Sequence, residues 1–177
     1  MLYIALLRGI NVGGHNVKMD VLRQLFTDLG FANVRTYIQS GNVFFETDET
    51  DRDALARKIE DHLLASLGYD VPTFLRTADE LAAILALDPF KHLDVTDDMR
   101  LAITFTTDPI RDLSLPARSP KNDMEIVHAT DHEAFVVWYI INGRPPANNW
   151  LDKTVGKRTT TRFFHTTGKI LEAARGG

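Results

Sequence analysis

The residues best suited to chemistry follow directly after an apolar run over residues 2–7. They combine cationic, amide and glycine residues, and they are Arg8, Gly9, Asn11, Gly13, Gly14 and Lys18. Glycine-rich loops can turn sharply and expose backbone amides, which bind phosphate and other anions. The glycine spacing differs from the dinucleotide pattern G-x-G-x-x-G, and no Gly-Lys-Ser/Thr follows it. These residues therefore predict either an anion-binding loop or a plain tight connection.

A second polar and partly aromatic segment precedes the apolar residues 43–45. It comprises Tyr37, Gln39, Ser40 and Asn42. Ser40 stands before a glycine, but no G-x-S-x-G motif surrounds it and no histidine or lysine lies nearby in the sequence, which favours a hairpin turn over a nucleophile. Arg35, Tyr37 and Gln39 alternate, so a strand would present them on one face. That face is either a ligand surface or the solvent side of an antiparallel sheet.

A third candidate lies in the carboxy-terminal region, where cations, hydroxyls and aromatics interleave. Between residues 153 and 171 there are five basic residues and no acidic one, namely Lys153, Lys157, Arg158, Arg162 and Lys169. The pattern around Thr161 and Arg162 suits phosphate contacts with stacking on a base or sugar. It suits a strand with Phe163 and Phe164 inward equally well. The positive charge indicates either an anion site or a solvated face balanced by acidic neighbours.

Composition excludes several kinds of site. The 177 residues include no cysteine, which excludes disulfides, thiolate catalysis and cysteine-ligated metals. His128 and His132 have the spacing of metal ligands on a helix but straddle a predicted strand-turn boundary, so we expect no metal and no cofactor. The net charge of −4 argues against a uniformly basic nucleic-acid binder. No apolar run approaches the ~20 residues of a membrane span, and no leader is recognisable, so we expect a cytoplasmic protein without membrane contact.

The elements that must position these residues alternate between strands and helices over residues 1–76. Apolar residues at helical spacing predict one helix around Leu22 to Leu29, ended by Gly30, and a second from a Thr50 cap to Gly68. Strands are predicted at residues 2–7, 34–38, 43–46 and 71–75. The order strand, helix, strand, strand, helix, strand predicts a ferredoxin-like α+β fold, with an antiparallel sheet and both helices on one face.

Residues 77–177 are predicted to form a second, looser α+β half, packed with the first half as one compact unit. A helix begins at Thr77, with Glu80 three residues later as a capping box, and Asp88-Pro89 ends it. The remaining predicted elements are strands over 101–106, 124–130 and 135–141, an exposed loop over 115–122, a mixed segment around 149–151 and a helix over 167–174. This half resembles a degenerate copy of the first, without a residue-level repeat.

Several motifs occur together along nearly the whole chain. They are ALLRGINVGG (5–14), Lys18-Met19, LGF (29–31), TYIQSGNVFF (36–45), Asp88-Pro89-Phe90, and Lys153 with Gly156 and TTR (160–162). In combination they closely resemble the bacterial family called domain of unknown function 1697. The resemblance implies an α+β fold with ferredoxin-like halves, and it implies no established activity.

The resemblance also implies a set of recurring polar positions. Here they are Arg8, Asn11, Gly13, Gly14, Lys18, Tyr37, Gln39, Ser40, Gly41, Asn42, Thr161, Arg162 and Lys169. The chain departs from the family pattern after Arg162, where the family tends to read Arg-Asn-Trp-Asn-Thr and this sequence reads Arg-Phe-Phe-His-Thr. The aromatic at Phe164 is kept in kind, but both asparagines are replaced. This departure weakens any essential hydrogen-bonding role for the segment.

These observations lead to one main functional expectation. The amino-terminal loop, the first hairpin and the basic segment would converge on a groove between the two halves. That groove would bind an anionic ligand, which is a nucleotide, a phosphate-bearing metabolite or nucleic acid. Arg8, Arg162 and Lys169 would supply positive charge, and Tyr37 would supply a stacking face.

Two alternatives come from other classes of protein. One is an enzyme acting on a phosphate-bearing substrate, with His15 or His165 as the base. The other is a structural protein without catalytic activity, in which an edge strand such as residues 101–106 pairs between chains. The chain would then be a small homo-oligomer rather than a monomer.

Overall fold

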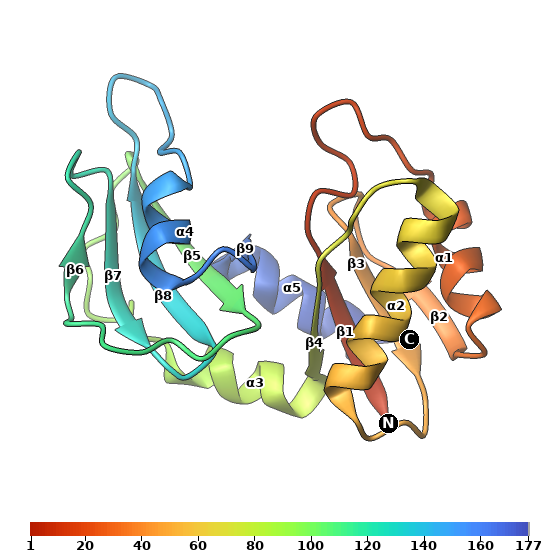
Figure 1. Ribbon diagram of the computed structural model, residues 1–177. Helices are drawn as coiled ribbons and strands as arrows, with labels where there is room; N and C mark the ends of the chain where they lie inside the picture. Colours follow the sequence, from red (N-terminus) through yellow and green to blue (C-terminus); the bar gives the residue numbers. More distant parts are fainter. Residues whose placement is uncertain (177) are drawn as a thin grey trace. The chain divides into compact units, whose positions relative to one another are not determined.

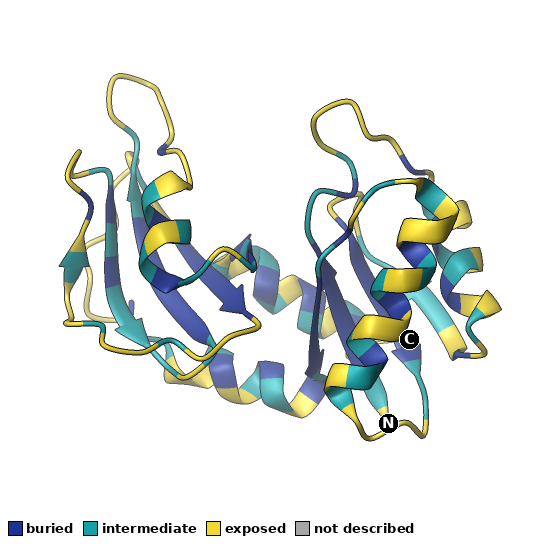
Figure 2. Cartoon of the chain, viewed as in Figure 1, coloured by how far each residue is buried: buried dark blue, intermediate teal, exposed yellow. Residues whose placement is uncertain are grey.

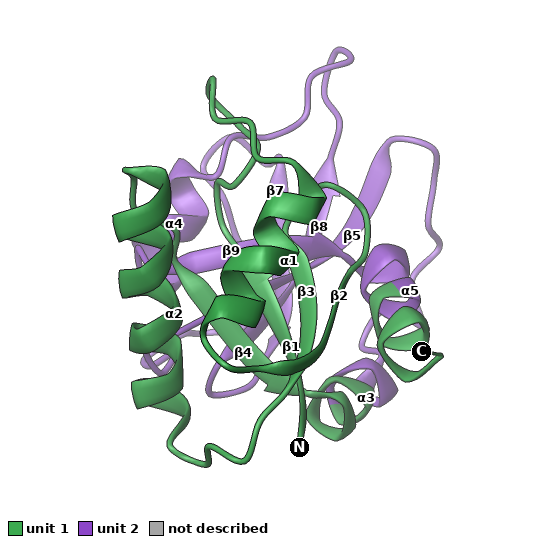
Figure 3. Cartoon of the chain, turned by 90° about the vertical axis from the view of Figure 1, so that its right-hand side faces the viewer, with its two compact units in different colours: residues 1–83, 170–177 green, residues 84–169 purple. Residues whose placement is uncertain are grey.

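The computed structural model describes residues 1–176 and shows two compact units (Figure 3). Unit 1 comprises residues 1–83 and the carboxy-terminal segment that begins at Ile170, and unit 2 comprises residues 84–169. The sequence-based division lay between residues 76 and 77. In the structure, helix α3 (Ala78–Leu87) runs from unit 1 into unit 2, and helix α5 (Phe164–Arg175) runs back from unit 2 into unit 1.

Unit 1 has the element order that the sequence predicts. Its elements are β1 (Leu2–Leu7), α1 (Met19–Asp28), β2 (Ala32–Thr36), β3 (Asn42–Glu46), α2 (Arg52–Leu67) and β4 (Thr73–Thr77). The strands form one antiparallel sheet in the order β2-β3-β1-β4. Both helices cover the same face of this sheet (Figure 1). The α+β class is thereby confirmed, and the strand order is that of a ferredoxin-like unit.

The core of unit 1 follows from the apolar spacing of its two helices. Leu22 and Phe26 of α1 are fully buried, as are Leu55, Ile59 and Leu63 of α2, and they share one cluster with the inward side chains of the sheet. Figure 2 shows these buried stripes against the exposed outer faces of the helices. Residues three and four apart share one helix face, so burial of that face places the helices on the sheet.

The amino-terminal cap of α2 differs from the prediction by one residue. Asp51 is the capping residue, and its carboxylate accepts a hydrogen bond of 3.1 Å from the backbone N–H of Ala54. The prediction of Thr50 as the capping residue was wrong. An aspartate here also places negative charge at the positive end of the helix, which a threonine cannot do.

Unit 2 contains a second antiparallel sheet, in the order β6-β7-β8-β5-β9. Its remaining elements are β5 (Met99–Thr106), β6 (Ala117–Arg118), β7 (Met124–Ala129), β8 (Glu133–Tyr139), α4 (Asn149–Val155) and β9 (Thr159–Phe163). Helix α4 covers one face of the sheet, where Leu151 and Val155 join a buried cluster with β7 and β8 (Figure 1). Strands β7 and β8 pair antiparallel up to Ala129 and Ala134, so the predicted hairpin around residues 131–132 is present.

Four expectations for unit 2 need correction. The loop over 115–122 contains the short strand β6, which pairs with β7, and the segment around residue 150 is the helix α4. Strand β5 is central, because it pairs with β8 on one side and β9 on the other, so residues 101–106 cannot offer an edge to another chain. Phe163 is 43% exposed and packs edge-on against Trp138 rather than pointing inward.

The two sheets share one strand arrangement. Without β6, the order of the second sheet is β7-β8-β5-β9, which repeats β2-β3-β1-β4 with β5 in the place of β1. Helix α4 lies between β8 and β9 as α2 lies between β3 and β4, and both helices end at a glycine with positive φ. Within residues 84–169, which are all described, no helix stands in the place of α1. The second half is therefore a looser copy of the first, as predicted.

The registers of the two sheets also agree residue by residue. Two sets of cross-strand pairs are equivalent, Ile4 with Arg76 and Phe44, and Ile103 with Arg162 and Phe135. Irregular pairing occurs at the same place in β2 and in β7. The strand ends are closed alike, since Leu7 N–H donates to the Gly41 carbonyl at 2.8 Å and Thr106 N–H donates to the His132 carbonyl at 2.9 Å. Features found in both units are therefore candidates for scaffold.

Candidate functional site

The predicted site residues of unit 1 lie on two neighbouring segments, residues 8–18 after β1 and residues 37–41 between β2 and β3. We call these two segments the loop cluster. Asn11 joins them, because its Nδ2 donates to the Gln39 carbonyl at 2.7 Å. Its Oδ1 accepts from the backbone N–H of Val17 at 2.7 Å, which closes the first segment on itself. One side chain therefore fixes both segments of the loop cluster.

Gly41 explains how closely the two segments approach. Its φ is +86°, and a Cβ at this position would lie 2.8 Å from Ile10 Cγ2 and 3.0 Å from Leu7 Cβ. Both distances are shorter than van der Waals contact, and positive φ is itself unfavourable for residues with a side chain. A glycine is needed here for packing. Gly41, one of the recurring positions that the family resemblance implies, therefore has a structural role.

Gly13 and Gly14 form an exposed turn at the far end of the loop cluster. Their φ values are +60° and +90°, and His15 N–H donates to the Val12 carbonyl at 3.1 Å, as in turns with positive φ at both central positions. A Cβ at either glycine would meet nothing within 4 Å. Within residues 1–176, the backbone N–H groups of these two glycines have no protein acceptor. The turn therefore presents two backbone donors to solvent.

Asn42, the first residue of β3, forms a local network with Ser40 of the loop cluster. Asn42 is fully buried, and its Nδ2 donates to the Tyr37 carbonyl and to Ser40 Oγ, each at 3.0 Å. A buried amide needs such partners. Ser40 is exposed, yet its hydroxyl is engaged with Asn42, which agrees with turn chemistry rather than with a nucleophile.

The alternating polar face predicted for Arg35, Tyr37 and Gln39 was wrong. Strand β2 ends at Thr36, and Ile38 has φ of +51°, which breaks the alternation. Arg35 instead stacks its guanidinium over Phe44 and donates to the carbonyl oxygens of residues 173 and 174, at 2.8 and 2.7 Å, in the last turn of α5. Its charge therefore caps a helix carboxyl terminus.

The two cations of the first segment differ in environment. Arg8 is half-buried at the end of β1, and its backbone N–H donates to the Pro72 carbonyl at 3.0 Å. Lys18 is exposed at the amino-terminal cap position of α1, and its side chain makes no capping hydrogen bond. Lys18 therefore adds positive charge at a helix end that already carries positive potential.

The predicted site residues of unit 2 lie on β9 and α5. Thr161 shares a hydrogen bond of 2.8 Å with Thr104 between neighbouring strands, and Lys169 is exposed. Arg162 is 8% exposed, and burial lowers its pKa to about 10. Its Nη1 donates to Thr160 Oγ1 at 2.8 Å and to the Thr161 carbonyl at 3.1 Å.

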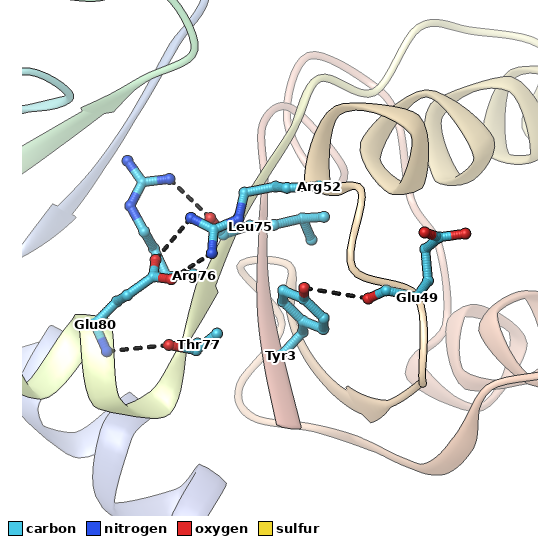
Figure 4. A network of polar contacts seen from close by, with 7 residues as sticks. All are labelled: Tyr3, Glu49, Arg52, Leu75, Arg76, Thr77 and Glu80. Carbon is cyan, nitrogen blue, oxygen red and sulfur yellow. Dashed lines mark hydrogen bonds and ion pairs between the residues drawn. The ribbon is translucent and has the colours of Figure 1, made fainter. Parts of the chain in front are cut away.

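A polar network that the sequence analysis did not identify links β4, α2 and α3 (Figure 4). Arg52 donates to both carboxylate oxygens of Glu80, from Nη1 at 2.7 Å and from Nη2. Burial alone would raise the pKa of Glu80, but the hydrogen bond from Arg52 and the charges of Arg52 and Arg76 lower it. The predicted capping box is half present, because Glu80 N–H donates to Thr77 Oγ1 at 3.1 Å whereas the Glu80 carboxylate binds Arg52.

The chain shows no metal-binding group of three or more His, Asp or Glu residues among residues 1–176. In the same range no helix is long and apolar enough to cross a membrane. His128 and His132 do not lie on a helix. His128 lies on β7 against Phe135, and His132 lies in the turn before β8.

Comparisons with known proteins agree with this architecture. The family described as "Protein of unknown function (DUF1697)" matches residues 1–135, a range that contains the whole loop cluster but ends before β9. No curated protein matches the chain. Among solved structures, the conserved bacterial protein SP0830 from Streptococcus pneumoniae is 23% identical, with 98% of each chain covered and a TM-score of 0.70. At this identity the likeness shows a shared fold and nothing about activity.

Proposed function

This chain belongs to the DUF1697 family, whose description names no activity, and from the geometry of the loop cluster we propose that it binds an anionic ligand through a phosphate group. A nucleotide or another phosphate-bearing metabolite has the required chemistry. The proposal rests on one observation, the exposed turn at Gly13 and Gly14 with two backbone N–H groups that have no protein acceptor within residues 1–176.

Held backbone amides are good anion ligands for a physical reason. Each N–H is a fixed dipole, and a turn that leaves two of them without a protein acceptor can donate both to one anion. The turn in this protein is restrained on its carboxyl side, because Asn11 Oδ1 accepts from Val17 N–H at 2.7 Å. Little conformational entropy is then lost on binding, which favours affinity.

Charge near the turn supports the same ligand class. Lys18 is exposed four residues after Gly14, and Arg8 stands at the start of the same segment. A phosphate group at the turn would gain from the charge of Lys18 even without direct contact, and that part of the binding energy would fall as salt rises.

Arg162 has a structural role in this proposal rather than contact with the ligand. Its equivalent in unit 1, Arg76, is also buried, at 7% exposed, and donates to the carbonyl of the preceding residue at 2.8 Å, as Arg162 does at 3.1 Å. Because this arrangement is present in both units, a role in the shared strand architecture explains it more simply than a role in one ligand site. The residues specific to unit 1, above all Gly13, Gly14 and Lys18, carry the proposed function.

The proposal is tested by titrating the ¹⁵N-labelled full chain with inorganic phosphate and, separately, with adenosine triphosphate. We expect saturable chemical-shift changes at the Gly13 and Gly14 amides, weaker at high salt. Lys18→Gln should lower phosphate affinity about two- to fivefold, the size of one partly screened charge interaction. The matched control is Lys121→Gln, an exposed lysine in unit 2.

Two results would contradict the proposal. One is an absence of change at the two glycine amides at millimolar phosphate. The other is an equal loss of affinity in the Lys18 and Lys121 variants, which would indicate unspecific attraction between phosphate and surface charge. A cytoplasmic location belongs to the same proposal, and cell fractionation tests it.

A further inference from the structure

Tyr69 contacts residues on both sides of Gly13 and Gly14. Its hydroxyl donates to the Ile10 carbonyl at 3.2 Å, before the turn. Its ring stacks on the His15 imidazole after the turn, with a centroid distance of 3.6 Å and an angle of 15° between the ring planes. A single side chain thus holds the segment three residues before Gly13 and one residue after Gly14.

The fold of unit 1 holds Tyr69 in place. It follows Gly68, which ends α2 with φ of +85°, and its ring packs on the apolar core of unit 1. Burial raises the pKa of Tyr69, whose phenol is already protonated at neutral pH, so the hydroxyl acts as a hydrogen-bond donor. The ring therefore lies between the core of unit 1 and the exposed turn, as a support for the turn.

The contact is specific to unit 1. The equivalent segment of unit 2, between the end of α4 and the start of β9, is Gly156, Lys157 and Arg158, without an aromatic residue. Unit 2 builds the same sheet arrangement without this ring, so the fold does not require it. The stacking of Tyr69 on His15 is therefore better explained by a role in holding the turn than by a role in building the sheet.

We propose that Tyr69, through His15 and Ile10, is a positioning residue that keeps the Gly13-Gly14 turn in the conformation that binds anions. This inference rests on the proposed function of the loop cluster. A turn that is competent for only part of the time binds with an affinity reduced by that fraction, so loss of the support should lower affinity in proportion to the loss of order.

The experiment separates turn order from anion binding. Backbone ¹⁵N relaxation of the ligand-free protein gives the order of Gly13, Gly14 and His15, and a titration with inorganic phosphate gives affinity. Tyr69→Leu removes ring stacking and the hydroxyl, and His15→Ala removes the stacking partner. We expect both variants to shift the three order parameters from rigid values, about 0.85, toward flexible ones, below about 0.6, and to weaken phosphate binding about three- to tenfold.

Two further variants make the result specific. His15→Phe keeps an aromatic ring over Tyr69 and should restore both order and affinity. Leu67→Ala truncates another side chain that packs on the same core, and it should lower the melting temperature without loosening the turn. Unchanged order in Tyr69→Leu and His15→Ala would overturn the positioning role. Lost order with unchanged phosphate affinity would show that the support of the turn does not serve binding. If the wild-type chain does not bind phosphate although the variants lose order as expected, the proposed function is overturned, and the role of Tyr69 in binding is overturned with it.

Discussion

Arg76 and Arg162 occupy the same position in the two units. Each is the fourth residue of a five-residue strand, pairs with an isoleucine of the central strand, and is followed after one residue by a helix. Each is buried and donates from Nη1 to the carbonyl of the residue before it. Two buried guanidinium groups at equivalent strand positions indicate a feature of the repeated sheet.

This equivalence predicts similar energetic roles for the two arginines. We expect Arg76→Ala and Arg162→Ala each to lower the free energy of unfolding by about 2–4 kcal/mol, because both lose buried contacts and charge-assisted hydrogen bonds. Denaturant unfolding measures the effect, and Arg111→Ala, at an exposed position, serves as control. A loss of phosphate binding in folded Arg162→Ala would instead return this residue to the ligand site.

Acid should weaken the link between Arg52 and Glu80. The folded-state pKa of Glu80 is lowered from its ordinary value of 4.5, so the pair stabilises the fold above that pH, and the contribution is lost as pH falls through the lowered pKa. Both side chains are more than a third exposed, at 39% and 38%, so we expect only about 0.2–1 kcal/mol near neutral pH.

The measurement compares Glu80→Gln with the wild type near neutral pH and in acid. The difference in free energy of unfolding should shrink in acid. Asp61→Asn, an exposed acidic residue on α2, should show no such trend. A difference for Glu80→Gln that is the same at both pH values would mean that charge is not what Glu80 contributes.

Alanine substitutions should distinguish the structural glycine of the loop cluster from an exposed one. Gly41→Ala combines positive φ with a clash against Ile10 and Leu7, so we expect a loss of about 2–4 kcal/mol. Gly14→Ala has open space around the new Cβ and should lose about 1 kcal/mol from backbone strain alone. Equal losses in denaturant unfolding would show that the close approach at Gly41 relaxes easily.

The start of α2 offers a test at adjacent residues. Asp51→Ala removes the side chain that accepts from Ala54 N–H, and it should cost about 1 kcal/mol. Thr50→Ala should change stability by less than about 0.5 kcal/mol, as at other surface positions. Thermal unfolding of the two variants compares them directly, and a larger effect at Thr50 would restore the cap expected from the sequence.

Local patterns in the sequence were sufficient for most of the fold. Apolar residues at helical spacing predicted α1 and α2, and alternation with turn residues predicted the hairpins. The two segments of the loop cluster were also predicted, because glycines and polar side chains interrupt the apolar patterning at residues 8–18 and 37–41. Errors arose where neighbouring residues could do the same task, as with Thr50 and Asp51, or where one left-handed residue, Ile38, broke an alternation.

The sequence by itself therefore determined the order of elements in unit 1, the α+β class and the segments that hold the candidate site. Only the tertiary structure showed that Asn11 reaches Gln39, that Tyr69 reaches Ile10, which is 59 residues away in the sequence, and that Arg76 and Arg162 occupy equivalent strand positions. The physical reason is that helix and strand patterns arise between residues a few positions apart, where geometry is regular. Contacts across many residues depend on sheet register and loop closure, which leave no periodic trace in the chain.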